Sequence, residues 1–170
     1  MPTAIRAAVV TSPTAICPSP SAGGPAVAFI TVGAVTVPVK AVTMSTAGVL
    51  EPPASSRVAA VSRQHADLDA DHGTSVLVWH SRFGQGCPGS LNPLLRQPIG
   101  TTFSVRTGTG MTRTYRIDQT AMVPQGRYRS AWFAQDGPHR LSLFTCSGLT
   151  SGRFTSTAFI HAVEVANGDS

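Results

Sequence analysis

The stretch Leu141-Ser142-Leu143-Phe144-Thr145-Cys146 indicates a β-strand that carries a thiol at its end. A loop with the last arginine of the chain, Arg153, follows it, and then a second apolar run from Ala158 to Val165. Upstream, the run from Ser75 to His80 ends in an imidazole in the same way. These three side chains offer a nucleophile, a proton-transfer group and an oxyanion donor, which are the parts that acyl transfer needs. The function therefore depends on whether they converge.

Composition predicts one all-β domain. The chain has 170 residues with 42% hydrophobic content, enough for a single core. Only 12% of the residues are charged, and the 16 Gly and 13 Pro favour short strands joined by turns. We expect residues 1–25, rich in Pro, Ser and Ala, to form a flexible N-terminal arm. Residues 26–166 then form the domain and residues 167–170 a C-terminal tail.

The charge pattern argues against a nucleic-acid partner. The net charge of +5 comes from Lys40 and twelve Arg residues that are scattered along the chain without forming a cluster. Such a diffuse charge suits an anionic cell envelope equally well. No stretch reaches the roughly 20 apolar residues that span a bilayer, and Arg6 interrupts the N-terminal apolar segment. Membrane association would therefore need an anchor that this sequence does not reveal.

The order of strands and turns can be drawn along the chain. Two β-branched runs flank Gly33-Ala34 and predict either one strand bent at the glycine or a short hairpin. The segment Arg57–Asp71 is the least strand-like, and we expect a helical turn there. The remaining expected elements are a short helix at Leu91–Leu95, a hairpin from Thr101–Arg106 and Met111–Asp118, and a long connection from Gln119 to His139.

Three cysteines allow at most one intramolecular disulfide. Cys17 lies in the Pro/Ser-rich arm and Cys87 in a Gly/Pro loop, so both are expected to face solvent and are able to pair. If they do pair, Cys146 is the thiol left over. Its local pattern fits a nucleophile and a small buried residue equally well.

Several motifs occur together in a characteristic order. Leu143-Phe144-Thr145-Cys146 matches a Leu-x-Thr-Cys box, and Val76–His80 is an apolar strand that closes on a histidine. In these features the chain resembles the sortases, the cysteine transpeptidases of Gram-positive cell surfaces, and especially the class F sortases of actinobacteria. The resemblance covers nearly all of residues 26–165. It also includes residues 32–39, residues 48–53, and residues 91–100 followed by the hairpin at 101–118.

The resemblance implies a closed, sortase-like β-barrel of about eight strands with one or two short helices. It implies that Cys146 is the nucleophile, His80 the acid/base group and Arg153 the oxyanion donor. The chemistry of the residue types agrees. A thiolate attacks a carbonyl, an imidazole returns a proton near neutral pH, and a guanidinium donates hydrogen bonds without acting as a base.

The resemblance also implies the substrate and its surroundings. A sorting-signal peptide of the Leu-Pro-x-Thr-Gly type would be cleaved between Thr and Gly through a thioester, which an amine of a cell-wall precursor or a pilin-type protein, or water, would release. Thr145 is expected to hydrogen-bond the peptide. Trp132 or Phe133, on the connection that walls the groove, would pack against its apolar residues or lie in the core. The enzyme would act as a monomer, without cofactor, on the extracellular face of a Gram-positive envelope.

Other readings stay open. A catalytically degenerate sortase-fold binding module is one, because the bulky Trp79 directly precedes His80 and only six residues separate Cys146 from Arg153. If that loop is merely short, Arg153 still reaches the site. If Arg153 lies within the loop, no later arginine replaces it. A peptidoglycan L,D-transpeptidase would need a His immediately before Gly86-Cys87, which is absent.

A metal site is not expected. His65, His72, His80 and Cys87 match no standard zinc-ligand spacing. The alternating Asp67, Asp69 and Asp71 lack the glycine and the distal glutamate of a calcium-binding loop. A solvated acidic turn is the better interpretation of these aspartates.

Overall fold

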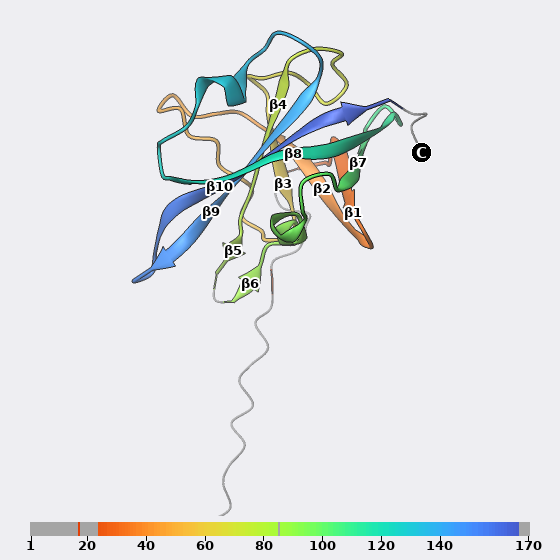
Figure 1. Ribbon diagram of the computed structural model, residues 1–170. Coiled ribbons are helices and arrows are strands. Elements are labelled where there is room, and N and C mark those ends of the chain that lie inside the picture. Colours follow the sequence, from red (N-terminus) through yellow and green to blue (C-terminus); the bar gives the residue numbers. More distant parts are fainter. Residues whose placement is uncertain (1–16, 18–23, 85, 167–170) are drawn as a thin grey trace, which may run out of the picture.

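The computed structural model describes residue 17, residues 24–84 and residues 86–166 (Figure 1). The expected arm therefore lies mostly outside the described residues, and the expected tail at 167–170 lies wholly outside them. The strands are β1 (Ala28–Val32), β2 (Val35–Val42), β3 (Ala59–Ser62), β4 (Thr74–Trp79), β5 (Arg82–Phe83), β6 (Cys87–Pro88), β7 (Thr102–Thr107), β8 (Thr112–Pro124), β9 (Arg140–Thr150) and β10 (Arg153–Val165). Two 3-10 helices, η1 (Asn92–Arg96) and η2 (Ser130–Phe133), complete the list.

Eight of these strands close into a barrel in the order β1-β2-β3-β4-β9-β10-β8-β7, and β7 pairs with β1 to complete the circle. The short β5 and β6 form a separate two-stranded sheet. The closed barrel of about eight strands with one or two short helices, predicted from the sequence, is thus confirmed. Among the described residues, no helix has the length and apolar character needed to cross a membrane.

Period-two alternation explains how the strands face the barrel interior. In β7 and β8 the buried Phe103, Val105, Tyr115 and Ile117 alternate with more exposed residues, as expected for strands with one wet face. β4 and β9 are different, because almost every residue in them up to Thr145 is buried. Their outer face is covered as well as their inner one.

The outer cover is a second apolar cluster. Trp132, from η2, packs with Val76, Phe144 and Phe159 on the outside of β4, β9 and β10. The indole of Trp132 stacks on the ring of Phe159 with their centroids 3.8 Å apart. Beyond the covered part of these strands, His80 is half-buried and Cys146 is exposed.

β4 and β9 pair in parallel, and their register is unbroken from Thr74 to Trp79. Leu77 lies opposite Leu143, Val78 opposite Phe144, and Trp79 opposite Thr145. Because the two strands run in the same direction, their carboxyl ends meet at one edge of the barrel. The two strand ends that the sequence marks with His80 and Cys146 are therefore neighbours.

The segment after Cys146 is a strand rather than a loop, which corrects the sequence interpretation. β9 continues to Thr150 and pairs with Arg153 at the start of β10. The turn between them consists of Ser151 and Gly152, both with positive φ (49° and 76°), the conformation that two-residue hairpin turns require. Figure 1 shows this hairpin projecting beyond the barrel.

Three further predictions are settled by the strand pairing. The segment Arg57–Asp71 contains strand β3, where we expected a helical turn. β8 runs on to Pro124, so the long connection starts after that residue and not at Gln119. At Gly33-Ala34 the chain makes a hairpin, in which Val32 pairs with Val35 and Gly33 has a φ of 57°. The short helix predicted near Leu91 is present as η1.

Cys17 and Cys87 form a disulfide, which confirms that the two are able to pair. Cys87 is only 3% exposed, so the expectation that it faces solvent was wrong. The bond ties the N-terminal segment to β6, whose Cys87 pairs with Phe83 of β5. Cys146 is then the free thiol of the chain.

A buried polar network lies around His139. Its Nδ1 accepts hydrogen bonds from Tyr115 Oη at 2.9 Å and from Arg113 Nη1 at 3.3 Å, and its Nε2 lies 2.9 Å from Ser75 Oγ. Burial, reinforced by the guanidinium of Arg113, lowers the pKa of His139 to about 4. Arg113 in turn pairs with Glu164 at 2.9 Å. This hydrogen-bond network joins residues that are distant in sequence, and the neutral imidazole of His139 lies at its centre.

Candidate active site

An apolar cavity of about 380 Å³ lies at the edge where β4 and β9 end. His80 and Cys146 both line it, together with Val78 of β4, Phe144 of β9 and Thr157 of β10. The opposite wall comes from Val49–Pro52 and from Tyr128. The cavity thus combines an imidazole, a thiol and a mostly apolar surface, which is the general character of a ligand pocket.

The strand register places His80 beside Cys146. Trp79 and Thr145 are the last paired residues of β4 and β9, so the next residue of each chain segment is level with the other. Neighbouring strands lie roughly 5 Å apart, and alternation turns His80 and Cys146 to the outer face, where both line the same cavity. The ring of His80 rests against that of Phe83, with 5.1 Å between centroids. The structure therefore brings together two of the three residues predicted to be catalytic.

The thiol of Cys146 is accessible to solvent, and its partial burial raises its pKa above the usual value. At neutral pH the group is therefore a neutral thiol, and attack on a carbonyl requires a base to take its proton. Histidine titrates in the right range for that task. His80 is the histidine that lines the same cavity as Cys146.

One polar side chain that the sequence did not single out reaches the sulfur. Gln125 Nε2 lies 3.9 Å from Cys146 Sγ and is oriented to donate to it. Gln125 follows the end of β8, and its backbone N–H donates to the carbonyl of Thr155 on β10. Gln125 lies 21 residues before Cys146 and in a turn, so no local sequence pattern links the two residues. Only the pairing of the strands brings Gln125 to the sulfur.

Arg153 lies away from the thiol. It pairs with Thr150, four residues beyond Cys146 on the same strand, while Thr157 occupies the position opposite Cys146. Four strand residues span roughly 13 Å, which exceeds the reach of one arginine side chain. Arg153 is the first residue of β10, so it lies on a strand at the tip of the hairpin and not in a loop, and no arginine follows it in the sequence. This placement does not support its predicted role as oxyanion donor.

Trp79 does not crowd the site, because it points into the barrel. It is 2% exposed and belongs to the interior cluster, and its indole N–H donates to Asn92 Oδ1 at 3.0 Å. Thr145 also turns inward, and its hydroxyl donates to the carbonyl oxygen of Trp79 at 2.7 Å. Thr145 lines the cavity, but its hydroxyl proton is already engaged in holding the end of β4 to β9.

Trp132 and Phe133, the other predicted substrate contacts, lie behind the cavity. Trp132 is 3% exposed in the outer cluster, and so takes the core position that the sequence left as an alternative. Phe133 is half-buried and stacks on Phe144, with an interplanar angle of 5°. Phe144 separates both from the cavity, which it lines. Their support of the site is therefore indirect in this structure.

The sequence also missed the wall formed by residues 49–52. Val49 is 57% exposed, an unusual position for a valine, and it lines the cavity with Leu50 and Pro52. Tyr128 completes this wall, and its hydroxyl lies 3.4 Å from Thr157 Oγ1. Residues 48–53 were part of the resemblance seen in the sequence, but their exposed apolar side chains, which often mark a binding site, are a property of the structure.

No family model and no curated protein matches this sequence. Solved structures do. A lid mutant of sortase A from Corynebacterium diphtheriae matches with a TM-score of 0.64 and 17% identity, over 84% of this chain and 71% of that one. Sortase C1 from Streptococcus agalactiae matches with a TM-score of 0.63 and 19% identity, over 84% and 68%. Sortase C from Clostridium perfringens SM101 matches with a TM-score of 0.60 and 14% identity, over 85% and 72%. The chain therefore has the sortase fold.

Proposed function

We propose that this chain is a sortase-type cysteine transpeptidase, of the kind found in class F. The observation that carries the proposal is the parallel pairing of β4 and β9, which sets His80 level with Cys146 at the edge of an apolar cavity. A thiol and an imidazole that line one cavity can act as a nucleophile and its base. The sortase fold of the solved structures supports the same chemistry.

The substrate is a peptide of the Leu-Pro-x-Thr-Gly type, whose apolar residues suit the wall formed by Leu50, Pro52 and Phe144. His80 removes the thiol proton as Cys146 Sγ attacks the Thr carbonyl. The tetrahedral intermediate then collapses, the C–N bond breaks, and the imidazolium gives the proton to the departing glycine amine. The acyl part is left as a thioester on Cys146.

The negative charge that develops on the carbonyl oxygen needs a donor within about 3 Å. Gln125 is placed for this, because its amide already lies 3.9 Å from the sulfur that forms the new bond. Side-chain amides serve as oxyanion donors in acyl transfer. We assign this role to Gln125, since Arg153 pairs four residues further along the hairpin.

An amine from a cell-wall precursor or a pilin-type protein takes the acyl group, and water does so more slowly. This chemistry places the protein on the extracellular face of a Gram-positive envelope. The disulfide between Cys17 and Cys87 supports that location, because such bonds persist in oxidising compartments.

Intact-protein mass spectrometry tests the proposal. The protein is incubated with a panel of Leu-Pro-x-Thr-Gly peptides, and we expect a thioester adduct that maps to Cys146 and disappears when an amine is added. His80→Ala should abolish the adduct, whereas His72→Ala, which changes an exposed histidine elsewhere, should leave it. An adduct that persists in Cys146→Ala, or that maps elsewhere, contradicts the proposal.

Two observations favour a second candidate, a sortase-fold module that binds such peptides without cleaving them. Arg153 lies away from the thiol, and burial raises the thiol pKa where a catalytic cysteine gains from a lowered one. Under this alternative the peptide binds the cavity reversibly, and no covalent adduct forms with any member of the panel. Equilibrium binding to the wild type and to Cys146→Ala with equal affinity would favour the module.

A further inference from the structure

Cys146 lies between two cavities. The apolar cavity that holds His80 is on one side, and a second one, of about 390 Å³, is on the other. The second cavity is bounded by Ser81 and Arg82 on one wall and by Ser147–Leu149 of the projecting hairpin on the other. Cys146 lines both cavities, and Ser81, the residue after His80, lines the second. A group held in either cavity can approach the same sulfur.

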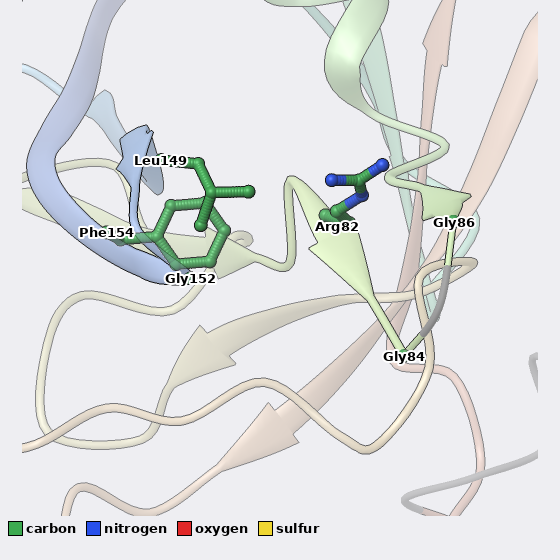
Figure 2. Close-up of a pocket in the computed structure, with 6 residues that line it drawn as sticks. All are labelled: Arg82, Gly84, Gly86, Leu149, Gly152 and Phe154. Carbon is green, nitrogen blue, oxygen red and sulfur yellow. The ribbon is translucent and has the colours of Figure 1, made fainter.

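The second cavity opens into a third of about 580 Å³, at the tip of the hairpin. Arg82, Leu149 and Phe154 line both. Figure 2 shows the side chains of Leu149 and Phe154 together on the hairpin, with Arg82 on the facing strand. We call the two cavities together the acceptor groove, defined by Arg82, Gly86, Leu149 and Phe154. It leads from the thiol to solvent between the β9–β10 hairpin and the β5–β6 sheet.

Charge in the acceptor groove comes from Arg82. It is exposed, and among the described residues lining the two cavities it alone carries a charge. Within residues 24–84 and 86–166 no Asp or Glu forms an ion pair with it. A guanidinium without a protein carboxylate is free to bind a carboxylate of a ligand, with two parallel hydrogen bonds.

The wall that carries Arg82 is held in place. Arg82 pairs with Pro88, and Phe83 pairs with Cys87, which the disulfide ties to Cys17. The opposite wall is the paired hairpin, in which Leu149 lies opposite Phe154. Preformed walls reduce the cost of binding a second molecule.

We propose that the acceptor groove binds the amine that resolves the thioester, and that it selects primary amines carrying a carboxylate, which Arg82 recognises. This inference rests on the proposed transpeptidase function, and it names the class of the second substrate. Leu149 and Phe154 provide apolar contact for the body of such a molecule, as in a short peptide with a free C-terminus.

The transfer step balances in protons and bonds. The neutral amine attacks the thioester carbonyl while His80 accepts one of its protons. The new C–N bond forms and the C–S bond breaks. The departing Cys146 sulfur then takes the proton from the imidazolium, so the products are an amide and the original thiol.

Matched acceptors test the carboxylate preference. The protein is first charged with a Leu-Pro-x-Thr-Gly peptide and then given the dipeptide Gly-Leu or its C-terminal amide, and the rate at which each resolves the thioester is measured. We expect the free acid to react roughly tenfold faster at low concentration, because a charge-assisted pair forms. Arg82→Gln should remove this preference without slowing thioester formation, while Arg116→Gln, at an exposed position on β8, should keep it. Equal rates for both acceptors in the wild type overturn the proposal and leave the transpeptidase function intact.

A binding measurement separates the two proposals. Cys146→Ala cannot form a thioester, so calorimetry or NMR titration with Gly-Leu reports on the acceptor groove alone. Saturable binding that weakens about tenfold in Arg82→Gln, and also when the amide replaces the acid, supports the groove even if no peptide charges the enzyme. The preference should shrink as salt is raised, because Arg82 is exposed. The inference is overturned if the affinity is the same for wild-type Arg82 and Arg82→Gln, and the same for the acid and the amide.

Discussion

Under the proposed transpeptidase function, comparing two substitutions, Arg153→Gln and Gln125→Ala, identifies the side chain that stabilises the oxyanion. Arg153 pairs with Thr150, roughly 13 Å along the strand from the level of Cys146, whereas Gln125 Nε2 lies 3.9 Å from the sulfur. We expect Arg153→Gln to leave the rate of thioester formation nearly unchanged. Gln125→Ala should lower it clearly.

The magnitudes follow from these two distances. Two unit charges about 13 Å apart in water interact by about 0.3 kcal/mol, and salt reduces this further. Removing the charge of Arg153 should therefore change the rate by less than about twofold. A buried oxyanion donor is worth roughly 100- to 1,000-fold. Gln125 is exposed, so water partly replaces it, and we expect a loss of about 10- to 100-fold.

Rapid mixing with saturating peptide, an acid quench and intact-mass analysis give the single-turnover rate of thioester formation for each variant. Arg116→Gln serves as the control for the loss of one positive charge on the surface. The reasoning is refuted if Arg153→Gln slows the step by a hundredfold while Gln125→Ala does not. That result would mean that the hairpin bends back to deliver the guanidinium when substrate is bound.

Four further predictions concern stability and the thiol. His139 has a pKa of about 4 in the folded protein and 6.5 in the unfolded chain, so the unfolded chain binds the proton more readily. The free energy of unfolding should therefore fall by about 3 kcal/mol as the pH drops from 7 to 4. In urea unfolding, His139→Gln should show a smaller dependence of this free energy on pH. Reducing the bond between Cys17 and Cys87, which are 70 residues apart, should cost about 2 to 4 kcal/mol of unfolding free energy, and an unchanged urea midpoint in reductant would contradict this. Trp132→Ala should destabilise by about 3 to 5 kcal/mol by leaving a cavity, seen as a lower thermal midpoint; a normal midpoint with weak peptide binding would instead indicate a substrate contact. The alkylation rate of Cys146 by iodoacetamide should still be rising above pH 9, later than for a thiol in a short peptide.

Local patterns in the sequence were sufficient for the strands that carry them. Alternation in residues 101–118 predicted the β7–β8 hairpin, and the β-branched runs around Gly33-Ala34 predicted β1 and β2. β3 escaped detection because Ala59-Ala60-Val61-Ser62 has little strand propensity of its own, and becomes a strand only by pairing with β2 and β4. β8 extends to Pro124 for the same reason, since β10 continues to pair with it.

The sequence by itself determined an all-β chain with one core, an odd number of cysteines, and a thiol and an imidazole each at the end of an apolar strand. These features depend on residue type and on spacing within a few residues, and so can be read locally. The tertiary structure decided that His80 and Cys146 are neighbours, that Gln125 approaches the sulfur and that Arg153 does not. Strand order and register arise from closing the barrel and burying both faces of β4 and β9, which involves residues far apart in the chain. For that reason no local pattern could predict how these side chains lie relative to one another.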